Sequence, residues 1–350
     1  MATTQGVGRS GAPDLAGIDR RAREIGRALF AEVGRGPSPM DRGWWDDRLM
    51  GLTMGDPRVK VQLFRFIDAL PSLVDDESVG RHLREYLGQA GGAVPRFLNL
   101  GVGLASIGLA PGRLLASAAR GAAAHMARRF IAGSTPAEAL ATVKALRKRG
   151  LGFTADLLGE AVISEPEAEA YQRTCIELIR GLAPPLAREP EDPRFDRSPS
   201  GPIPRVNLSL KLTSLTPRFD AIHAEATARR VADRLRPILR AARESGAFVN
   251  VDMEQYAHKN LTNAIFRAVF SEPEFRDWPD VGIVAQAYLP EAEADLHGLA
   301  DWARDRGAPI TVRLVKGAYW DYEVTHARQL GWPVPGRCCM KQEVARTGRP

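Results

Sequence analysis

Lysine is scarce in this sequence, although the chain is basic. Of 48 basic residues only seven are lysines, namely Lys60, Lys144, Lys148, Lys211, Lys259, Lys316 and Lys341. Arginine therefore supplies nearly all of the positive charge. Two of the lysines, Lys211 and Lys316, lie within apolar strand patterns, where a buried cation is costly unless a site uses its charge. This placement makes both lysines candidates for chemistry.

Cysteines and long apolar runs are also few. Cys175, Cys338 and Cys339 cannot form a disulfide framework and lack the spacing of a zinc site, so we predict a cytoplasmic protein without a bound metal. The first residues hold no apolar core of a signal peptide. The most apolar region, Phe97–Ala124, is interrupted by one proline and two arginines. We expect a buried pair of helices there rather than a membrane span.

The net charge of +6 by itself permits binding to nucleic acid or to an acidic membrane surface. The basic residues, however, are interleaved with Asp and Glu, and the sequence has no long basic run with spaced aromatics. This pattern is typical of a solvated, arginine-rich surface, and we predict no binding to nucleic acid.

A dinucleotide-binding loop is missing as well. The first strong strand, in LGFTADLLGEA, is not followed by the Gly-x-Gly-x-x-Gly turn that binds phosphate. From this point strands alternate with helices, and the predicted strands are Phe153–Leu158, Val206–Leu212, Phe248–Met253, Val281–Ala287 and Ile310–Val315. Serial strand–helix units build a parallel sheet. We therefore predict an α/β protein with either an open doubly wound sheet or a (β/α)8 barrel.

Polar residues at the end of every strand favour the barrel, because eight-fold barrels assemble their active site at that edge. These residues are Asp156 and Glu160, Lys211, Asp252 and Glu254, Gln286, and Arg313 and Lys316. Five strands do not close such a barrel. We therefore predict an incomplete (β/α)8 TIM-type barrel of about five βα units.

An α-helical region precedes the predicted barrel. Helix Pro57–Leu70 has Asp56 as its N-cap, and a second helix begins at Pro136 after Thr135. The expected divisions are a poorly ordered N-terminus (1–40), an α-helical arm domain (41–150), a partial barrel (151–335) and an aberrant tail (336–350). The tail, GRCCMKQEVARTGRP, has no strand or helix period, which suggests an abrupt end or a reading-frame error.

Residue type alone leaves the role of the charged residues open. Lys211 could form a Schiff base, anchor a carboxylate, or pair with Asp156 or Asp252. Two acids at alternate positions of a strand, such as Asp252 and Glu254, point to one face. They suit structural ion pairs or, with His258, weak metal ligation.

The uncharged candidates are equally open. Gln286 suits the polar edge of a ligand or a hydrogen-bond network in the core. Tyr319 and Trp320 suit stacking on a flat ligand or plain core packing.

Four motifs resemble the proline dehydrogenase barrel, in particular that of bifunctional proline utilisation A proteins. VNLSLKLTSLTPRF, VDMEQY, IVAQAYLP and VRLVKGAYWDYE occur in the family's order with similar gaps. The resemblance covers about residues 40–335, and its helical part, Trp44–Arg149, resembles the N-terminal arm of the bifunctional family. It implies FAD-dependent oxidation of L-proline to Δ1-pyrroline-5-carboxylate, with electrons passed to a membrane quinone.

The resemblance also implies residue roles. Asp252 and Arg313 match catalytic residues, and Lys211 and Tyr319 match substrate-binding residues. Cofactor contacts are implied for Met253, Gln286, Arg313, Lys316, Gly317, Ala318 and Trp320. NAD would serve only an aldehyde dehydrogenase part further along the bifunctional proteins. A peripheral contact with the inner face of the membrane and a homo-oligomer are both compatible with this family.

Two parts of the family pattern are absent from the sequence. These are a helix with paired arginines for the proline carboxylate and the later strands that hold the adenosine end of FAD. We therefore expect this 350-residue chain to be inactive alone, and insoluble or poor at binding FAD. The alternative function is a lyase or aldolase barrel that forms a Schiff base at Lys211 or Lys316.

Overall fold

The computed structural model describes residues 15–33, 51, 55–91, 112–127, 131–158, 162–199 and 201–336. The chain divides into two compact units, Met1–Arg129 and Phe130–Pro350. Of the predicted N-terminal segment 1–40 only residues 15–33 are described, and of the predicted tail only Gly336. The rest of these two segments, and most of the apolar region Phe97–Ala124, lies outside the described residues.

The first unit is helical where it is described. Its helices are α1 (Leu15–Val33), α3 (Pro57–Ala69), α4 (Asp76–Gln89) and α6 (Gly112–Ala127), with a 3-10 turn at Leu70–Ser72. As predicted, Asp56 caps α3: its side chain accepts a hydrogen bond from Arg58 N, and Pro57 is the first helical residue. Across the described residues of both units, no helix is long and apolar enough to cross a membrane.

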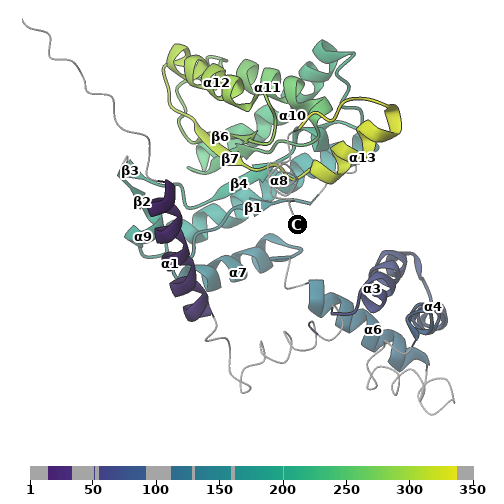
Figure 1. Ribbon diagram of the computed structural model, residues 1–350. Helices are drawn as coiled ribbons and strands as arrows, with labels where there is room; N and C mark the ends of the chain where they lie inside the picture. The colour runs from purple at the N-terminus through teal and green to yellow at the C-terminus, as the bar shows by residue number, and fades with distance from the viewer. Residues whose placement is uncertain are drawn as a thin grey trace, which may run out of the picture. The chain divides into compact units, whose positions relative to one another are not determined.

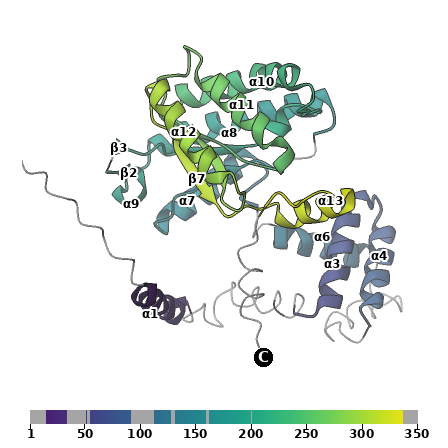
Figure 2. The same ribbon diagram turned by 45° about the horizontal axis from the view of Figure 1, so that its top comes forward.

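The second unit contains a parallel five-stranded sheet (Figures 1 and 2). Its strands, in spatial order, are β1 (Ala155–Asp156), β4 (Asn207–Leu210), β5 (Phe248–Val251), β6 (Val281–Gln286) and β7 (Thr311–Val315). The helices between and around them are α7 (Pro136–Lys148), α8 (Glu165–Ala187), α10 (Ala224–Glu244), α11 (Tyr256–Phe270), α12 (Ala292–Arg306) and α13 (Trp320–Leu330). This is the predicted α/β fold with a partial barrel, and every predicted strand is present, although each is shorter than expected.

The two faces of the sheet differ in polarity. Leu208 and Leu210 of β4, with Val249 and Val251 of β5, belong to a large hydrophobic core shared with α8, α10 and α11. The opposite face carries a row of residues that pair directly across the strands: Asp156, Ser209, Asn250, Gly282 and Thr311. Because successive side chains of a strand point to opposite faces, this row forms a polar face of the sheet. The apolar residues between its members form the opposite face, which packs on the core.

The sequence predicts a helix over Glu165–Leu182 followed by a loop rich in proline, arginine and aspartate at Ala183–Pro204, but part of this loop is structured. Helix α8 continues through Pro184 and Pro185 to Ala187, beyond the predicted end at Leu182. Its last turn is retained because Leu186 is fully buried in the core. The rest of the predicted 183–204 loop forms the short helix α9 (Pro193–Asp196) and an antiparallel pair, β2 (Arg197–Ser198) and β3 (Gly201–Pro202).

A buried ion pair fixes this segment. Both terminal nitrogens of Arg147 in α7 donate to the Asp196 carboxylate, at 2.8 and 2.7 Å, and Asp192 N donates to it at 2.8 Å. The Arg147 hydrogen bonds hold the pKa of Asp196 below its usual range. The pair joins α7 to α9, so α7 packs within the second unit.

Candidate active site

Asp252 is the centre of a hydrogen-bond network at the carboxyl edge of the sheet. It follows β5 directly, and its Oδ1 accepts from Ser209 Oγ at 2.6 Å, Asn250 Nδ2 at 2.9 Å and Arg313 Nη1 at 3.3 Å. Its Oδ2 lies 3.8 Å from Lys211 Nζ. The network joins β4, β5 and β7, so the structure brings together Lys211, Asp252 and Arg313, as the sequence predicted.

Lys211 pairs with both carboxylates that the sequence suggested. Its Nζ donates to Asp156 Oδ1 at 2.8 Å, a shorter contact than the 3.8 Å to Asp252. The Lys211 side chain is 8% exposed, whereas that of Asp156 is 46% exposed. An ammonium buried this deeply is stable only when it is paired. Asp156 and Asp252 balance the charges of Lys211 and Arg313.

Arg313 is the more accessible of the two cations. It is the third residue of β7, its side chain is 38% exposed, and its Nη1 also donates to Ser209 Oγ at 3.2 Å. A guanidinium held by two acceptors on the edge of a sheet presents a fixed positive charge to whatever binds there.

Glu254 does not join this network, although the alternation of a strand would place it on the face of Asp252. Strand β5 ends at Val251, so Asp252 directly continues its alternation, whereas Glu254 lies three residues beyond the strand, where the alternation no longer holds. The Glu254 carboxylate accepts from Thr213 Oγ1, and its main-chain carbonyl accepts from Gln286 Nε2 at 3.1 Å. Within the described residues, no three His, Cys, Asp or Glu side chains form a group that could hold a metal ion.

Gln286, the last residue of β6, is 3% exposed. Its Oε1 is buried without a hydrogen-bond partner among the described residues. A buried acceptor without a donor costs roughly 1–3 kcal/mol, and such atoms commonly meet a ligand. This side chain therefore serves the local network through its nitrogen, and its oxygen remains a buried acceptor among the described residues.

The turn after β7 packs closely against the ring of Tyr288. Gly317 has φ +125°, and a Cβ at this position would lie 1.6 Å from Tyr288 Cε1. Trp320, the first residue of α13, meets the Tyr288 ring edge-to-face at 6.1 Å. Burial raises the pKa of Tyr288 to about 12, and its hydroxyl lies buried without a partner among the described residues. Trp320 thus packs against a protein side chain, one of the two roles the sequence left open.

The remaining predicted residues lie at this turn or in the hydrophobic core. Lys316 and Ala318 are exposed, and Tyr319 is the half-buried residue preceding α13. Met253 is 7% exposed and belongs to the main hydrophobic core.

Sequence reasoning missed Ser209, Asn250 and Tyr288. The first two lie two residues before Lys211 and Asp252 and therefore share their face of the sheet. Tyr288 lies two residues after Gln286. Strand alternation was the signal that could have found Ser209 and Asn250, whereas Tyr288 lies in the turn after β6, where alternation gives no signal. The alternation was overlooked because serine and asparagine in a strand have no chemistry that demands a site.

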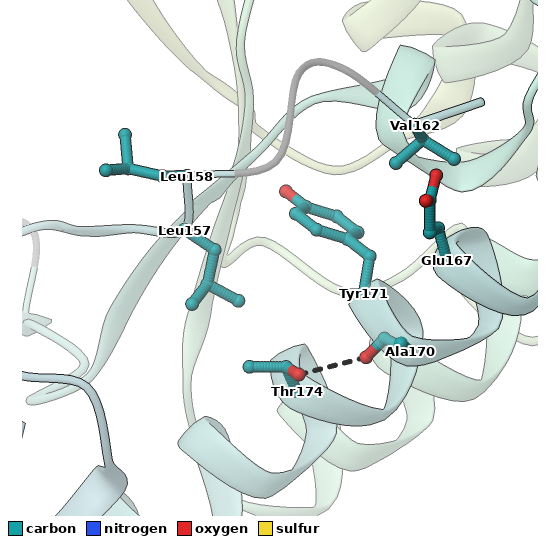
Figure 3. Close-up of a pocket in the computed structure, with 7 residues that line it drawn as sticks. All are labelled: Leu157, Leu158, Val162, Glu167, Ala170, Tyr171 and Thr174. Carbon is teal, nitrogen blue, oxygen red and sulfur yellow. Dashed lines mark hydrogen bonds between the residues drawn. The ribbon is translucent and has the colours of Figure 1, made fainter. Parts of the chain in front are cut away.

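An apolar pocket of about 350 Å³ lies beside the edge, between the end of β1 and α8 (Figure 3). It is lined by Leu157, Leu158, Val162, Glu167, Ala170, Tyr171 and Thr174. Tyr171 points into it, and the Tyr171 hydroxyl accepts from Lys211 N at 3.3 Å. Burial raises the pKa of Tyr171 well above its usual value. The pocket therefore adjoins Lys211 through one buried side chain, and the described residues that line it include none of the predicted site residues.

Two family models match the chain. The model described as proline dehydrogenase matches residues 139–337, and the model of the proline utilization A N-terminal domain matches residues 19–130. The N-terminal match ends at residue 130, at the boundary between the two compact units, and the proline dehydrogenase match begins at residue 139, within the second unit.

Known proteins show the same similarity. The bifunctional protein PutA of Klebsiella aerogenes is 28% identical over 206 residues, which are 59% of this chain and 15% of that protein. Proline dehydrogenase 1 of Bacillus subtilis subsp. natto is 35% identical over 193 residues, 55% of this chain and 52% of that protein.

A solved structure agrees with them. The crystal structure of proline utilization A from Bdellovibrio bacteriovorus, inactivated by N-propargylglycine, is 37% identical with a TM-score of 0.76. It covers 91% of this chain, which corresponds to 31% of that protein. The chain therefore spans between about a seventh and about half of the length of these relatives.

Proposed function

Since this chain belongs to the proline dehydrogenase family, we propose that its Asp252 network is part of an active site that oxidises L-proline to Δ1-pyrroline-5-carboxylate with FAD. The observation that supports this most directly is the convergence of Lys211 and Asp252, directly after β4 and β5, with Arg313 of β7, which lies two strands from β5 in the sheet. Strand ends are where barrel enzymes place their reactive groups. The solved relative inactivated by N-propargylglycine, a secondary amine with a carboxylate, agrees with a substrate of this kind.

Lys211 holds the substrate carboxylate in this proposal. Its ammonium is a compact point charge at the end of β4, and its two carboxylate neighbours hold it in position. Tyr319, at the start of α13, belongs to the same substrate pocket.

The residues at the edge fit a flavin. The buried Oε1 of Gln286 is an acceptor that suits a ring N–H group, and the Arg313 guanidinium is a fixed cation on the accessible side. Met253, Lys316, Gly317, Ala318 and Trp320 complete the proposed cofactor contacts, although Met253 lies within the core. Bound FAD supplies the acceptor for the hydride that leaves the proline ring carbon next to nitrogen.

Arg313 contributes electrostatically. A preorganised cation stabilises negative charge that develops in the reaction, because no solvent must reorganise around it. Asp252 holds Arg313 in place through its Oδ1 and limits the total positive charge of the site. Asp252 is therefore assigned a catalytic role through charge balance and orientation.

The proposals on domain role, electron acceptor and assembly are based on the similarity to bifunctional proteins. We propose that the first unit is the arm domain of a bifunctional protein and that electrons pass to a membrane quinone from a site on the inner face of the membrane. The aldehyde dehydrogenase part of such a protein would use NAD. Assembly into a homo-oligomer belongs to the same proposal.

The test is replacement of Arg313 in a full-length version of the protein loaded with FAD, called the FAD-loaded protein from here on, because the 350-residue chain alone is expected to be inactive. Arg313→Met should lower the rate of flavin reduction by L-proline roughly 100-fold, the usual cost of losing one preorganised electrostatic group. Stopped-flow absorbance at the flavin band measures this rate, and urea unfolding measures stability.

Arg313→Lys is the matched control, since it keeps the charge while losing the second hydrogen-bonding nitrogen. It should recover part of the rate. Unchanged reduction in Arg313→Met would remove Arg313 from its proposed role.

A further inference from the structure

We propose that Ser209 and Asn250 are positioning residues that hold Asp252 and Arg313 in their catalytic arrangement. The proposal rests on the proposed function, because Asp252 and Arg313 are the groups assigned to it. Ser209 and Asn250 are each 1% exposed, whereas the side chains of Arg313 and Asp252, which they support, are 38% and 17% exposed.

The direction of each hydrogen bond around Ser209 is determined. Its hydroxyl carries one hydrogen, and the 2.6 Å contact with the Asp252 carboxylate uses it, because a carboxylate can only accept. The lone pairs of Ser209 Oγ are then left for Arg313 Nη1 and Asn250 Nδ2, each at 3.2 Å. Both of these nitrogens can only donate. The Ser209 hydroxyl therefore accepts a hydrogen bond from Arg313 and donates one to Asp252, so it links the two charged groups.

Asn250 completes the arrangement from the next strand. Its Nδ2 lies 2.9 Å from Asp252 Oδ1 and 3.2 Å from Ser209 Oγ, so one amide group orients both. The strand register places Ser209 directly opposite Asn250, with Gly282 opposite Asn250 on its other side. A Cβ on Gly282 would lie 3.0 Å from Asn250 Oδ1 and 2.8 Å from Phe248 Cζ. Glycine at this position leaves the amide the room it occupies.

These contacts determine where the Arg313 side chain points. A long arginine side chain that is 38% exposed gains little rigidity from one ion pair, because solvent competes for its nitrogens. Two buried neutral groups reduce that freedom: Ser209 accepts from the guanidinium, and Asn250 fixes both Ser209 and Asp252. Removal of the Ser209 hydroxyl should free Arg313 and weaken its effect on the flavin while leaving every charge of the site present.

The experiment compares Ser209→Ala with two matched variants. Ser209→Thr retains the hydroxyl on the same strand face. Thr227→Val removes another buried hydroxyl. Thr227 lies on α10, away from the Asp252 network, and its hydroxyl donates to the main-chain carbonyl of Asp220 at 3.0 Å. Ser209→Cys, with a weak donor of similar size, serves if the alanine variant does not fold.

In the FAD-loaded protein, Ser209→Ala should reduce the flavin with proline about tenfold more slowly, which corresponds to one hydrogen bond to a charged group. Its flavin midpoint potential should become more negative, because the reduced ring loses part of its stabilisation. Ser209→Thr should stay within about threefold of the native rate, and Thr227→Val should match it. A purely structural role of Ser209 would lower stability in both deletion variants and leave the potential unchanged, which would overturn the proposal.

Crystal structures give a readout that does not depend on the flavin. The Arg313 guanidinium should lie against Asp252 in the native protein and in Ser209→Thr, and away from it in Ser209→Ala. An Arg313 that keeps its place in Ser209→Ala would overturn the proposal. A native protein that proline cannot reduce would instead contradict the proposed function, and the position of Arg313 would still decide the roles of Ser209 and Asn250.

Discussion

Of the two carboxylates described beside Lys211, Asp156 is the nearer, and it is a residue that the family resemblance did not bring into the site. The 2.8 Å contact with Asp156 is an ångström shorter than that with Asp252. Asp156 is also the more exposed carboxylate, at 46% against 17%, and it lies at the end of an edge strand. If Lys211 holds the substrate carboxylate, that anion must take the place of Asp156.

Asp156→Asn should therefore bind carboxylate ligands about threefold to tenfold more tightly, because an amide competes for an ammonium less strongly than a carboxylate does. Cyclopentanecarboxylate, which has no amine, is a suitable probe, and calorimetric titration of the FAD-loaded protein measures its affinity. Asp301→Asn, whose carboxylate on α12 is 70% exposed, is the control and should change nothing. Weaker binding in Asp156→Asn would show that Asp156 orients Lys211 rather than competing for it.

At the scale of elements, the turn between β7 and α13 is held by close packing and by one buried acid. The backbone of Gly317 lies against the Tyr288 ring, and Glu323 in α13 accepts a hydrogen bond from Tyr256 N at 2.7 Å. Tyr256 is the first residue of α11, where main-chain N–H groups lack helical partners. Helix α13 thus caps α11, and the turn that carries Lys316 to Trp320 is fixed at both of its ends.

Alanine substitutions at two glycines would separate the cost of backbone strain from the cost of a packing clash. Gly307, which ends α12 with φ +81°, has open space where a Cβ would be, so Gly307→Ala should cost only about 1 kcal/mol of conformational strain. Gly317→Ala adds a clash with Tyr288 and should cost about 3 kcal/mol or more. Urea unfolding checks the difference, and an equal loss in both variants would contradict the packing of Tyr288 described above.

At the scale of the whole molecule, the sheet has two open edges. Among the described residues β1 pairs only with β4, and β7 pairs only with β6. Leu314 of β7 is 58% exposed, and no residue of β7 is fully buried. Unpaired parallel edges with exposed apolar side chains are templates for association with other chains.

The 350-residue chain should consequently self-associate at micromolar concentrations, and Leu314→Lys should increase the monomeric fraction, since charged residues protect strand edges. Sedimentation velocity measures the distribution. Ile222→Lys replaces an apolar residue that is 89% exposed outside the sheet and should have no comparable effect. A chain that sediments as a monomer throughout this range would contradict the prediction.

Local pattern was sufficient for much of this architecture. The helices Pro57–Ala69 and Pro136–Lys148 and the order of the five strands follow from caps and apolar periodicity, which depend on near neighbours in the chain. The meeting of Lys211, Asp252 and Arg313 also followed, because the carboxyl ends of parallel strands share one edge.

Other features depend on contacts between distant segments of the chain, which sequence pattern does not reveal. The continuation of α8 through Pro184 and Pro185 depends on burial of Leu186 against the rest of the core, which outweighs the local tendency of proline to end a helix. The separation of Asp252 from Glu254 depends on where β5 stops. The roles of Ser209 and Asn250 arise only when the strand register places them opposite each other, because a neutral side chain acquires its function from the partner that folding brings to it.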